Sequence, residues 1–222
     1  MVAARKLEPQ KERIIVEMVH EFRGDYPDVP ISPDVDIEEL TKPDKEAGLE
    51  PFFVTFALAA YNQKSRNNRI YCNEVAVRAV YNAIMEQKIG GNKGHTPEHL
   101  RSTFFEAPVL HWVGAKIVGN GDNQVCWGKA YIPGDSERMR EMRGYYRRQM
   151  ATNSRVGTSL EGWGFQEYDD ENDTYKIMDL TVWRIDVVES EQAGITLANS
   201  LPPKITSETK KDIQEAILDD VA

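Results

Sequence analysis

Ser159 is a candidate nucleophile because glycines flank it at the start of a predicted strand, in Gly157-Thr158-Ser159-Leu160-Glu161-Gly162. The Gly-x-Ser-x-Gly spacing of a nucleophile elbow is absent, and a strand follows where that motif needs a helix. A serine beside glycines can still act as a nucleophile, because backbone N–H groups are free to hold an oxyanion. The alternative is an ordinary turn serine, and residue chemistry alone leaves both interpretations open.

His95 is a candidate general base. It follows Gly90-Gly91-Asn92-Lys93-Gly94, which predicts a flexible loop that presents the histidine at its end. A surface histidine on a glycine loop is the plainer alternative. His111 is a second candidate, because it lies on a predicted strand and its side chain could face the sheet interior.

A zinc site is a further alternative. His95, Glu98 and His99 match the His-x-x-Glu-His spelling of inverted zinc peptidases. That motif needs both histidines on one face of a helix. Pro97 fits best as the first residue of a helix capped by Thr96, which leaves His95 before the helix and apart from His99. The spelling of the motif therefore lacks its structural context.

A hairpin predicted over residues 156–188 brings a carboxylate toward Ser159. If Tyr168 pairs with Tyr175 across the acidic turn, Ser159 lies opposite Arg184, and Asp186 is its diagonal neighbour on the same face. A one-residue slip in register would reverse the faces. Asp186 could orient a histidine beside Ser159, or it could be no more than the salt-bridge partner of Arg184.

Asp179 is the competing carboxylate on the same predicted hairpin. The register above places it opposite Gly164, on the other face and roughly 16 Å along the strand from Ser159. Asp186 is therefore the better candidate for a group that orients a histidine beside the serine.

The elements around these residues predict an α+β fold. Hydrophobic alternation and turn residues predict antiparallel hairpins, and the helices are too few for a doubly wound parallel sheet. We therefore expect a curved or barrel-like antiparallel sheet with helices at its side. The expected strands cover residues 52–60, 109–118, 124–132, 156–168 and 175–188, and the expected helices begin at Asn73, at Asp135 or Ser136, and near Thr206 or Ser207.

The composition of the chain changes along its length. Residues 24–51 hold five of the eleven prolines and many acidic residues, which indicates an extended connector or removable arm. The segment before it, residues 11–22, could be a strand or a helix. We expect an N-terminal extension and arm over 1–51, a main domain over 52–200 and a C-terminal amphipathic helix over 201–222.

Charge and hydrophobicity limit the function classes. The 36 acidic residues outnumber the 27 basic ones, which argues against a general nucleic-acid binder. Arginines in the helix predicted over 136–150 alternate with glutamates and are typical of a solvated face. There is no apolar signal-peptide core and no apolar run long enough for a membrane span, so we expect a cytoplasmic protein. The tryptophans, which all lie in predicted strands, are expected in the core: Trp112, Trp127, Trp163 and Trp183.

Six segments, taken in order over about residues 53–199, resemble the prohead (head-maturation) proteases of tailed phages. In that family the nucleophile strand reads Gly-Val-Ser-x-x-Gly, the histidine lies in a Gly-His-Pro loop, and the last segment reads Asp-x-Val. The matching segments are Asn67-Asn68-Arg69-Ile70-Tyr71, Gly94-His95-Thr96-Pro97, Leu110-His111, Gly128-Lys129-Ala130-Tyr131-Ile132, Gly157-Thr158-Ser159 with Gly162, and Asp186-Val187-Val188.

This resemblance implies a serine endopeptidase with the fold of herpesvirus assemblin, a curved antiparallel barrel with flanking helices. By the resemblance Ser159 is the nucleophile, His95 the general base and Asp186 the third residue. His111 is the alternative third residue, because the herpesvirus relatives use a second histidine there. Arg155 or Arg184 could help to stabilise the oxyanion. No metal and no cofactor is implied.

The resemblance also implies a role. Proteases of this family cleave the major capsid protein and the scaffold or core proteins inside the immature head, in the host cytoplasm. We therefore expect these proteins as partners, a homo-oligomer, and neither a nucleic-acid nor a membrane partner. The arm or the C-terminal helix would target or inhibit the enzyme. The alternatives are the zinc peptidase and a non-enzymatic head-assembly scaffold protein on the same fold.

Overall fold

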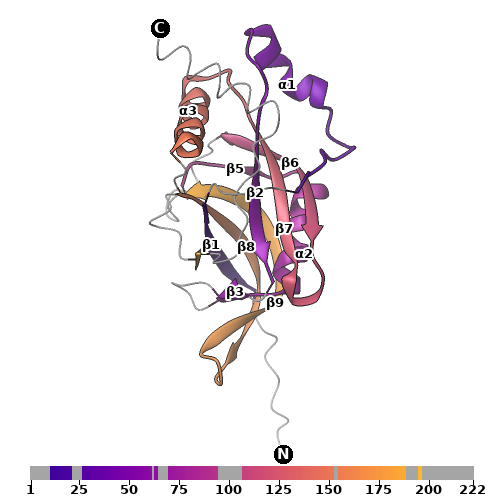
Figure 1. The fold of residues 1–222 in the computed structure, drawn as a ribbon. Coiled ribbons are helices and arrows are strands. Elements are labelled where there is room, and N and C mark those ends of the chain that lie inside the picture. The colour runs from indigo at the N-terminus through magenta and orange to yellow at the C-terminus, as the bar shows by residue number, and fades with distance from the viewer. Residues whose placement is uncertain are drawn as a thin grey trace, which may run out of the picture.

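The computed structural model describes residues 11–21, 27–61, 63–64, 70–94, 107–152, 155–188 and 195–196. Within these ranges the chain forms ten strands, three α-helices and one short 3-10 helix. The strands make two sheets, and helix α2 (Glu74–Met85) contacts strands of both (Figure 1). The predicted α+β class with a curved, mainly antiparallel sheet and flanking helices is confirmed.

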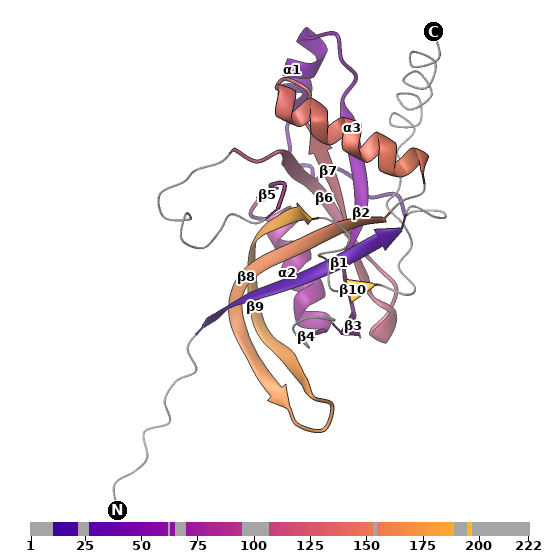
Figure 2. The same cartoon turned by 90° about the vertical axis from the view of Figure 1, so that its left-hand side faces the viewer.

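The larger sheet has six strands in the order β10-β1-β8-β9-β4-β3. All neighbours are antiparallel except the β1–β10 and β4–β9 pairs, which are parallel. Its longest strands, β8 and β9, curl visibly along their length (Figure 2). Residues 11–22, which could have been strand or helix, form strand β1. The strands are β1 (Glu12–Glu21), β3 (Gln63–Lys64), β4 (Ile70–Cys72), β8 (Arg155–Asp169), β9 (Thr174–Val188) and β10 (Ile195–Thr196).

The smaller sheet has four antiparallel strands in the order β2-β7-β6-β5. Its central hairpin is closed by the predicted glycine-rich turn, which contains the 3-10 helix Gly121–Asn123. Every residue of β2 is buried, including Thr55, which interrupts its otherwise apolar sequence. The strands are β2 (Phe52–Ala60), β5 (Gly90–Gly91), β6 (Leu110–Val118) and β7 (Val125–Ile132), and the three longer ones match the predicted ranges to within one residue.

Helix α2 is the centre of the hydrophobic core. Asn73 caps it as predicted, because its side chain accepts a hydrogen bond from the N–H of Ala76 at 3.2 Å. The Asn73 amide also donates to the carbonyl of Ile177 in β9 at 2.6 Å, which ties the start of the helix to the larger sheet. The buried face of the helix consists of Ala76, Val77, Val80, Ala83 and Ile84.

The prediction of an extended connector over residues 24–51 is wrong for its central part, which forms helix α1 (Ile37–Glu46). Asp36 caps this helix, and Asp44 is fully buried against Arg143 of helix α3 (Glu137–Ala151). Helices α1 and α3 lie at the same end of the molecule (Figure 1). The acidic composition hid this packing, because the contact that buries Asp44 is made by a residue 99 positions away.

The solvated arginine face predicted for residues 136–150 is wrong at Arg143, which is buried. Its Nε donates to the carbonyl of Ile132 at 2.8 Å and its Nη1 to that of Glu50 at 3.2 Å. Ser136 caps α3, one of the two predicted capping positions, and accepts from the N–H of Met139 at 3.3 Å.

Two of the four tryptophans predicted in the core lie instead on the surface. Trp112 and Trp127 are buried, whereas Trp163 and Trp183 are 49% and 40% exposed. The exposed pair lies on the β8–β9 hairpin, whose far part projects from the body (Figure 1). Burial alternates along β9, where Val182 is buried and Trp183 is exposed, so the two exposed tryptophans lie on the solvent face of the hairpin.

The division of the chain at residues 51 and 200 stays a prediction. The predicted C-terminal helix over 201–222 lies outside the described residues.

Candidate active site

Ser159 of β8 lies directly opposite Asp186 of β9. Directly opposed residues of antiparallel strands project from the same face, with their Cβ atoms about 4.5–5.5 Å apart. Both side chains are fully buried. The structure thus brings the predicted nucleophile and the predicted third residue side by side.

The pairing that produces this contact differs from the predicted one. Tyr168 does pair with Tyr175, as predicted, but Ser159 does not lie opposite Arg184. The β8–β9 pairing contains two bulges, each of which places one extra residue in β9. On the β8 side they lie between Phe165 and Gln166 and between Glu161 and Gly162. The pairing therefore shifts by two residues, which moves Asp186 from the diagonal position to the direct one.

Asp186 is held by two groups at its two oxygens. The backbone N–H of Asn92 donates to Oδ1 at 2.8 Å, and Nε of Arg184 lies 2.8 Å from Oδ2 in an ion pair. A buried carboxylate without partners is costly, so these contacts offset its desolvation. The interpretation of Asp186 as the salt-bridge partner of Arg184 is thus correct, and it coexists with the pairing to Ser159.

Glu161 is a site residue that the sequence analysis missed. It follows Ser159 by two positions on the same face of β8 and is fully buried. Its Oε2 lies 3.2 Å from Nη2 of Arg184, and its Oε1 pairs with Nε of Arg13 on β1. The available signal was the spacing of polar or charged residues by two in both strands, at 159–161 and 184–186, which places polar groups on one face of each strand.

Residues 90–94, which we call the strap, connect the smaller sheet to the Asp186 region. Gly90 and Gly91 pair with β6, and the strap then crosses to Val187 of β9. There the carbonyl of Asn92 accepts from the Val187 N–H at 2.8 Å, and the Gly94 N–H donates to the Val187 carbonyl at 2.7 Å. The prediction of a flexible glycine loop is wrong for these residues, because both sheets hold them.

Gly91 shows why the strap is rich in glycine. A Cβ atom added there would lie 2.0 Å from the carbonyl oxygen of Ile185, so only glycine lets the strap pass over β9 this closely. Gly94, at the end of the strap, has a φ of 73° and precedes His95 in the chain. His95 lies outside the described residues, as do Glu98 and His99 of the zinc alternative.

Asp179, the competing carboxylate, is far from Ser159. It pairs with Phe165 instead of the predicted Gly164, six residues along β8 and therefore about 20 Å from Ser159. Its side chain is 47% exposed and forms an ion pair with Lys11 at 3.1 Å. The structure does not bring this carboxylate to the serine.

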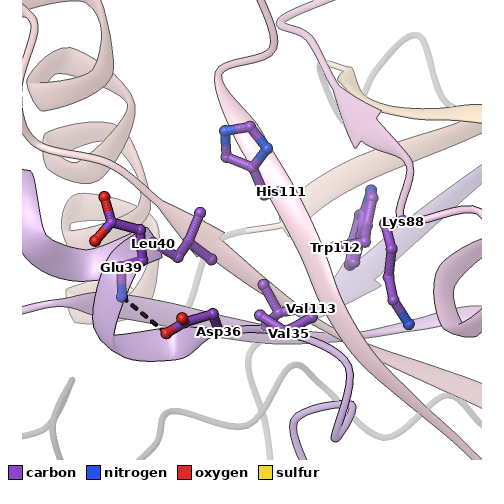
Figure 3. Close-up of a pocket in the computed structure, with 8 residues that line it drawn as sticks. All are labelled: Val35, Asp36, Glu39, Leu40, Lys88, His111, Trp112 and Val113. Carbon is purple, nitrogen blue, oxygen red and sulfur yellow. Dashed lines mark hydrogen bonds between the residues drawn. The ribbon is translucent and has the colours of Figure 1, made fainter.

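His111, the alternative third residue, lies on the other side of β6 from the serine. The adjacent Trp112 sends its indole N–H toward β9, where it donates to the carbonyl of Ile185 at 3.1 Å. Neighbouring residues of a strand point to opposite faces, so His111 faces away from β9. Its half-buried side chain lines a pocket of about 480 Å³ under α1 (Figure 3).

The pocket beside His111 has an apolar floor and few groups that could do chemistry. Burial lowers the pKa of His111, and the nearby Asp135 carboxylate partly opposes this shift. The carboxylate of Asp36 is occupied as the cap of α1, accepting from the Glu39 N–H at 3.0 Å (Figure 3). Among the described residues that line the pocket there is no serine or cysteine: Val35, Asp36, Glu39, Leu40, Lys88, His111, Trp112 and Val113.

Neither a metal-binding cluster nor a membrane-spanning helix occurs in the part of the chain that the structure describes. That part contains no group of three or more His, Cys, Asp or Glu residues that could hold a metal ion. None of its helices is long and apolar enough to cross a membrane.

No protein-family model matches the chain, and no curated protein sequence matches it either. Among solved structures, the chain is similar to the bacteriophage T4 capsid assembly protease gp21, with a TM-score of 0.49 and 18% sequence identity. The similarity covers 81% of this chain and 99% of that one.

Proposed function

We propose that the chain is a serine endopeptidase of phage head maturation, which cleaves capsid and scaffold proteins inside the immature head. The observation that carries this proposal is the direct pairing of Ser159 with the buried Asp186. These are the two positions at which the sequence resembles the nucleophile strand and the closing Asp-x-Val segment of the prohead proteases.

In the proposed mechanism Ser159 attacks the scissile carbonyl and His95 is the general base. The imidazole takes the hydroxyl proton and returns it to the leaving amine, which a serine and a carboxylate cannot do without a base of moderate pKa. Asp186 would hold the imidazole in the tautomer that accepts this proton. The position of Gly94 supports the assignment. Its N–H donates a hydrogen bond to the carbonyl of Val187, the residue after Asp186, and His95 follows Gly94 directly in the chain.

The oxyanion of the tetrahedral intermediate needs a separate donor. Arg184 already contacts the carboxylates of Glu161 and Asp186, which makes it a poor candidate for a third anion. This favours backbone N–H groups near Ser159, or Arg155, as the stabilising group.

The burial of Ser159 adds a requirement to this mechanism. Because the side chain has no exposed surface, a polypeptide substrate reaches it only after the site opens. We propose that opening accompanies assembly with the capsid and scaffold proteins, the partners that the resemblance implies, in the procapsid within the host cytoplasm. A homo-oligomer is part of the same proposal.

Co-expression with the cognate capsid precursor tests the proposal, with the products read by intact mass. The variants are Ser159→Ala and His95→Ala, and His111→Ala is the matched control because that histidine faces the pocket under α1. We expect cleavage by the wild type and His111→Ala, and none by the other two variants.

Two other outcomes would contradict the proposal. Equal cleavage by Ser159→Ala would remove the serine mechanism and favour the zinc alternative, which loss of cleavage in Glu98→Gln would then support. Binding of the precursor by the wild type with no cleavage in the assembled head would favour the non-enzymatic scaffold protein.

A further inference from the structure

We infer that Glu161 and Arg13 are positioning residues for Asp186, and that they act through the guanidinium of Arg184. The inference rests on the proposed function, because it assigns Asp186 the task of orienting a histidine. It concerns three strands of the larger sheet, since Arg13 lies on β1, Glu161 on β8, and Arg184 with Asp186 on β9.

Arg184 bridges two buried carboxylates with two different nitrogens. Its Nε lies 2.8 Å from Oδ2 of Asp186, and its Nη2 lies 3.2 Å from Oε2 of Glu161. The guanidinium group is planar and rigid, so fixing one of these nitrogens also fixes the direction of the other. Glu161 therefore constrains the orientation of the guanidinium group beside Asp186.

Glu161 is itself fixed from the opposite side. Its second oxygen, Oε1, pairs with Nε of Arg13 on β1, which neighbours β8 on the side away from β9. The side chains of Arg13 and Arg184 are 22% and 17% exposed, whereas that of Glu161 has no exposed surface. Glu161 is thus clamped between two guanidiniums from strands on both sides of its own, and its orientation is transmitted to Arg184.

This clamp matters because a guanidinium and a carboxylate prefer to bind through two parallel contacts. An Arg184 released by Glu161 could turn and engage both oxygens of Asp186. The Asn92 N–H already donates to Oδ1, so an added contact from Arg184 would crowd the carboxylate and change the direction in which it holds an imidazole. Glu161 prevents this by holding Nη2.

The test uses Glu161→Gln and Arg13→Gln in the full chain, assembled with the capsid and scaffold proteins and assayed on an added peptide that spans a capsid cleavage site. We expect kcat to fall about 10- to 100-fold in Glu161→Gln, with KM within about twofold, because the orientation of the base changes and the substrate surface does not. Arg13→Gln should lower kcat less, by about 3- to 10-fold, since it acts one contact further away.

Two conservative variants separate positioning from a general loss of structure. Arg13→Lys keeps a cation beside Glu161 and should recover most of the kcat lost in Arg13→Gln. Arg184→Lys places one ammonium where two nitrogens are needed, so kcat should fall as in Glu161→Gln. The matched control is Asp179→Asn, which removes the exposed ion pair with Lys11 on the same face of the sheet and should leave kcat within twofold.

A crystal structure of Glu161→Gln provides a readout that does not depend on activity. We expect Arg184 to contact both oxygens of Asp186 in that variant. An unchanged single contact through Nε, or a kcat equal to that of the wild type, would overturn the inference. Failure of the proposed function would look different, because Ser159→Ala would then cleave as well as the wild type. If Glu161→Gln does not fold, the comparison of Arg13→Gln with Arg13→Lys decides.

Discussion

Two buried carboxylates, Asp44 and Asp186, have similar surroundings and different neighbours. Each is fully buried, each accepts from a backbone N–H, and each contacts one arginine. Asp44 is further occupied by the hydroxyl of Tyr131, which donates to its Oδ2 at 2.7 Å. Asp186 instead lies opposite Ser159. A buried, ion-paired carboxylate is therefore no sign of catalysis by itself, and the residue across the strand distinguishes the two.

The arginines of the two clusters differ in the same way. Besides its contact with Asp44, Arg143 donates to the backbone carbonyls of Ile132 and Glu50, so each of its three nitrogens helps to hold α1 and α3 on β7. Arg184 bridges two carboxylates on one face of the larger sheet. We interpret the cluster of Asp44 with Arg143 and Tyr131 as structural, and the cluster of Asp186 with Arg184 and Glu161 as part of the site. Substitutions in the first should change stability, and substitutions in the second should change activity.

The largest expected effect is the loss of activity in Asp186→Asn. Asparagine can still accept from the Asn92 N–H, but it would hold the imidazole in the wrong tautomer, so kcat/KM should fall by about 10⁴-fold. That loss corresponds to about 5.5 kcal/mol of transition-state stabilisation. The measurements are peptide hydrolysis and the melting temperature. Activity within tenfold of the wild type would exclude Asp186 as the third residue.

Asp44→Ala should have the next largest effect, on stability. The substitution leaves the buried guanidinium of Arg143 and the Tyr131 hydroxyl without their carboxylate, at a cost of about 3–5 kcal/mol. Burial and the Asp44 carboxylate raise the pKa of Tyr131, so its hydroxyl stays protonated as a donor in the wild type. Urea unfolding measures the change.

The control for this substitution is Glu38→Ala on the same helix, which removes an exposed ion pair with Lys45 and should cost well under about 1 kcal/mol. Equal stability of the two variants would show that α1 is not held by the Asp44 cluster. The activity of the Asp44→Ala protein that remains folded should match that of the wild type.

The sequence predicted five of the strands, β2 and β6 to β9, together with the central hairpin and the Tyr168–Tyr175 pair, because apolar alternation and turn residues are local signals. It did not predict the two bulges in the β8–β9 pairing. The extra residues of these bulges, Met178 and Trp183, are exposed, and nothing else in the sequence pattern indicates them. Ser159 and Asp186 were identified through a resemblance of motifs, and their direct contact depends on those bulges.

Helix α1 is a whole element that was not predicted from the sequence. Pro43 lies inside it, and a proline in a helix interior argued against a helix. The cap at Asp36, the glutamates of the first turn and a lysine in the last turn were local signals in its favour. The contact of Asp44 with the distant Arg143 stabilises the helix further. Glu161 was missed for a related reason, because its partners lie on two other strands.

Gly91→Ala should affect both stability and activity, so it sharpens the comparison between the Asp44 cluster and the Asp186 cluster. Because the added Cβ would lie 2.0 Å from the Ile185 carbonyl oxygen, the strap has to move, at a cost of about 1–3 kcal/mol. That movement draws the Asn92 N–H from Asp186, and a misplacement of about 1 Å at a catalytic group can reduce kcat about 100-fold. Unfolding and peptide hydrolysis are measured on the same preparation.

Gly144→Ala is the control for the strap variant, because its Cβ would meet only the flexible side chain of Arg148 within α3. An alanine in a helix interior should stabilise the protein by about 0.5–1 kcal/mol and leave kcat unchanged. If Gly91→Ala behaves like this control, the strap does not position the site.

The smallest expected effect is at the exposed Lys11–Asp179 pair, which lies on the same sheet as the buried Arg13–Glu161 pair. Water already solvates both of its charges, so forming the pair releases little free energy, and Lys11→Ala should cost less than about 1 kcal/mol. Salt screens such a pair, and the cost should shrink further when the ionic strength is raised to about 1 M. Arg13→Ala should keep most of its cost under the same conditions, because Glu161 remains buried and loses a cation that solvent cannot replace. A cost for Lys11→Ala equal to that for Arg13→Ala, with the same dependence on salt, would mean that burial does not separate the two pairs.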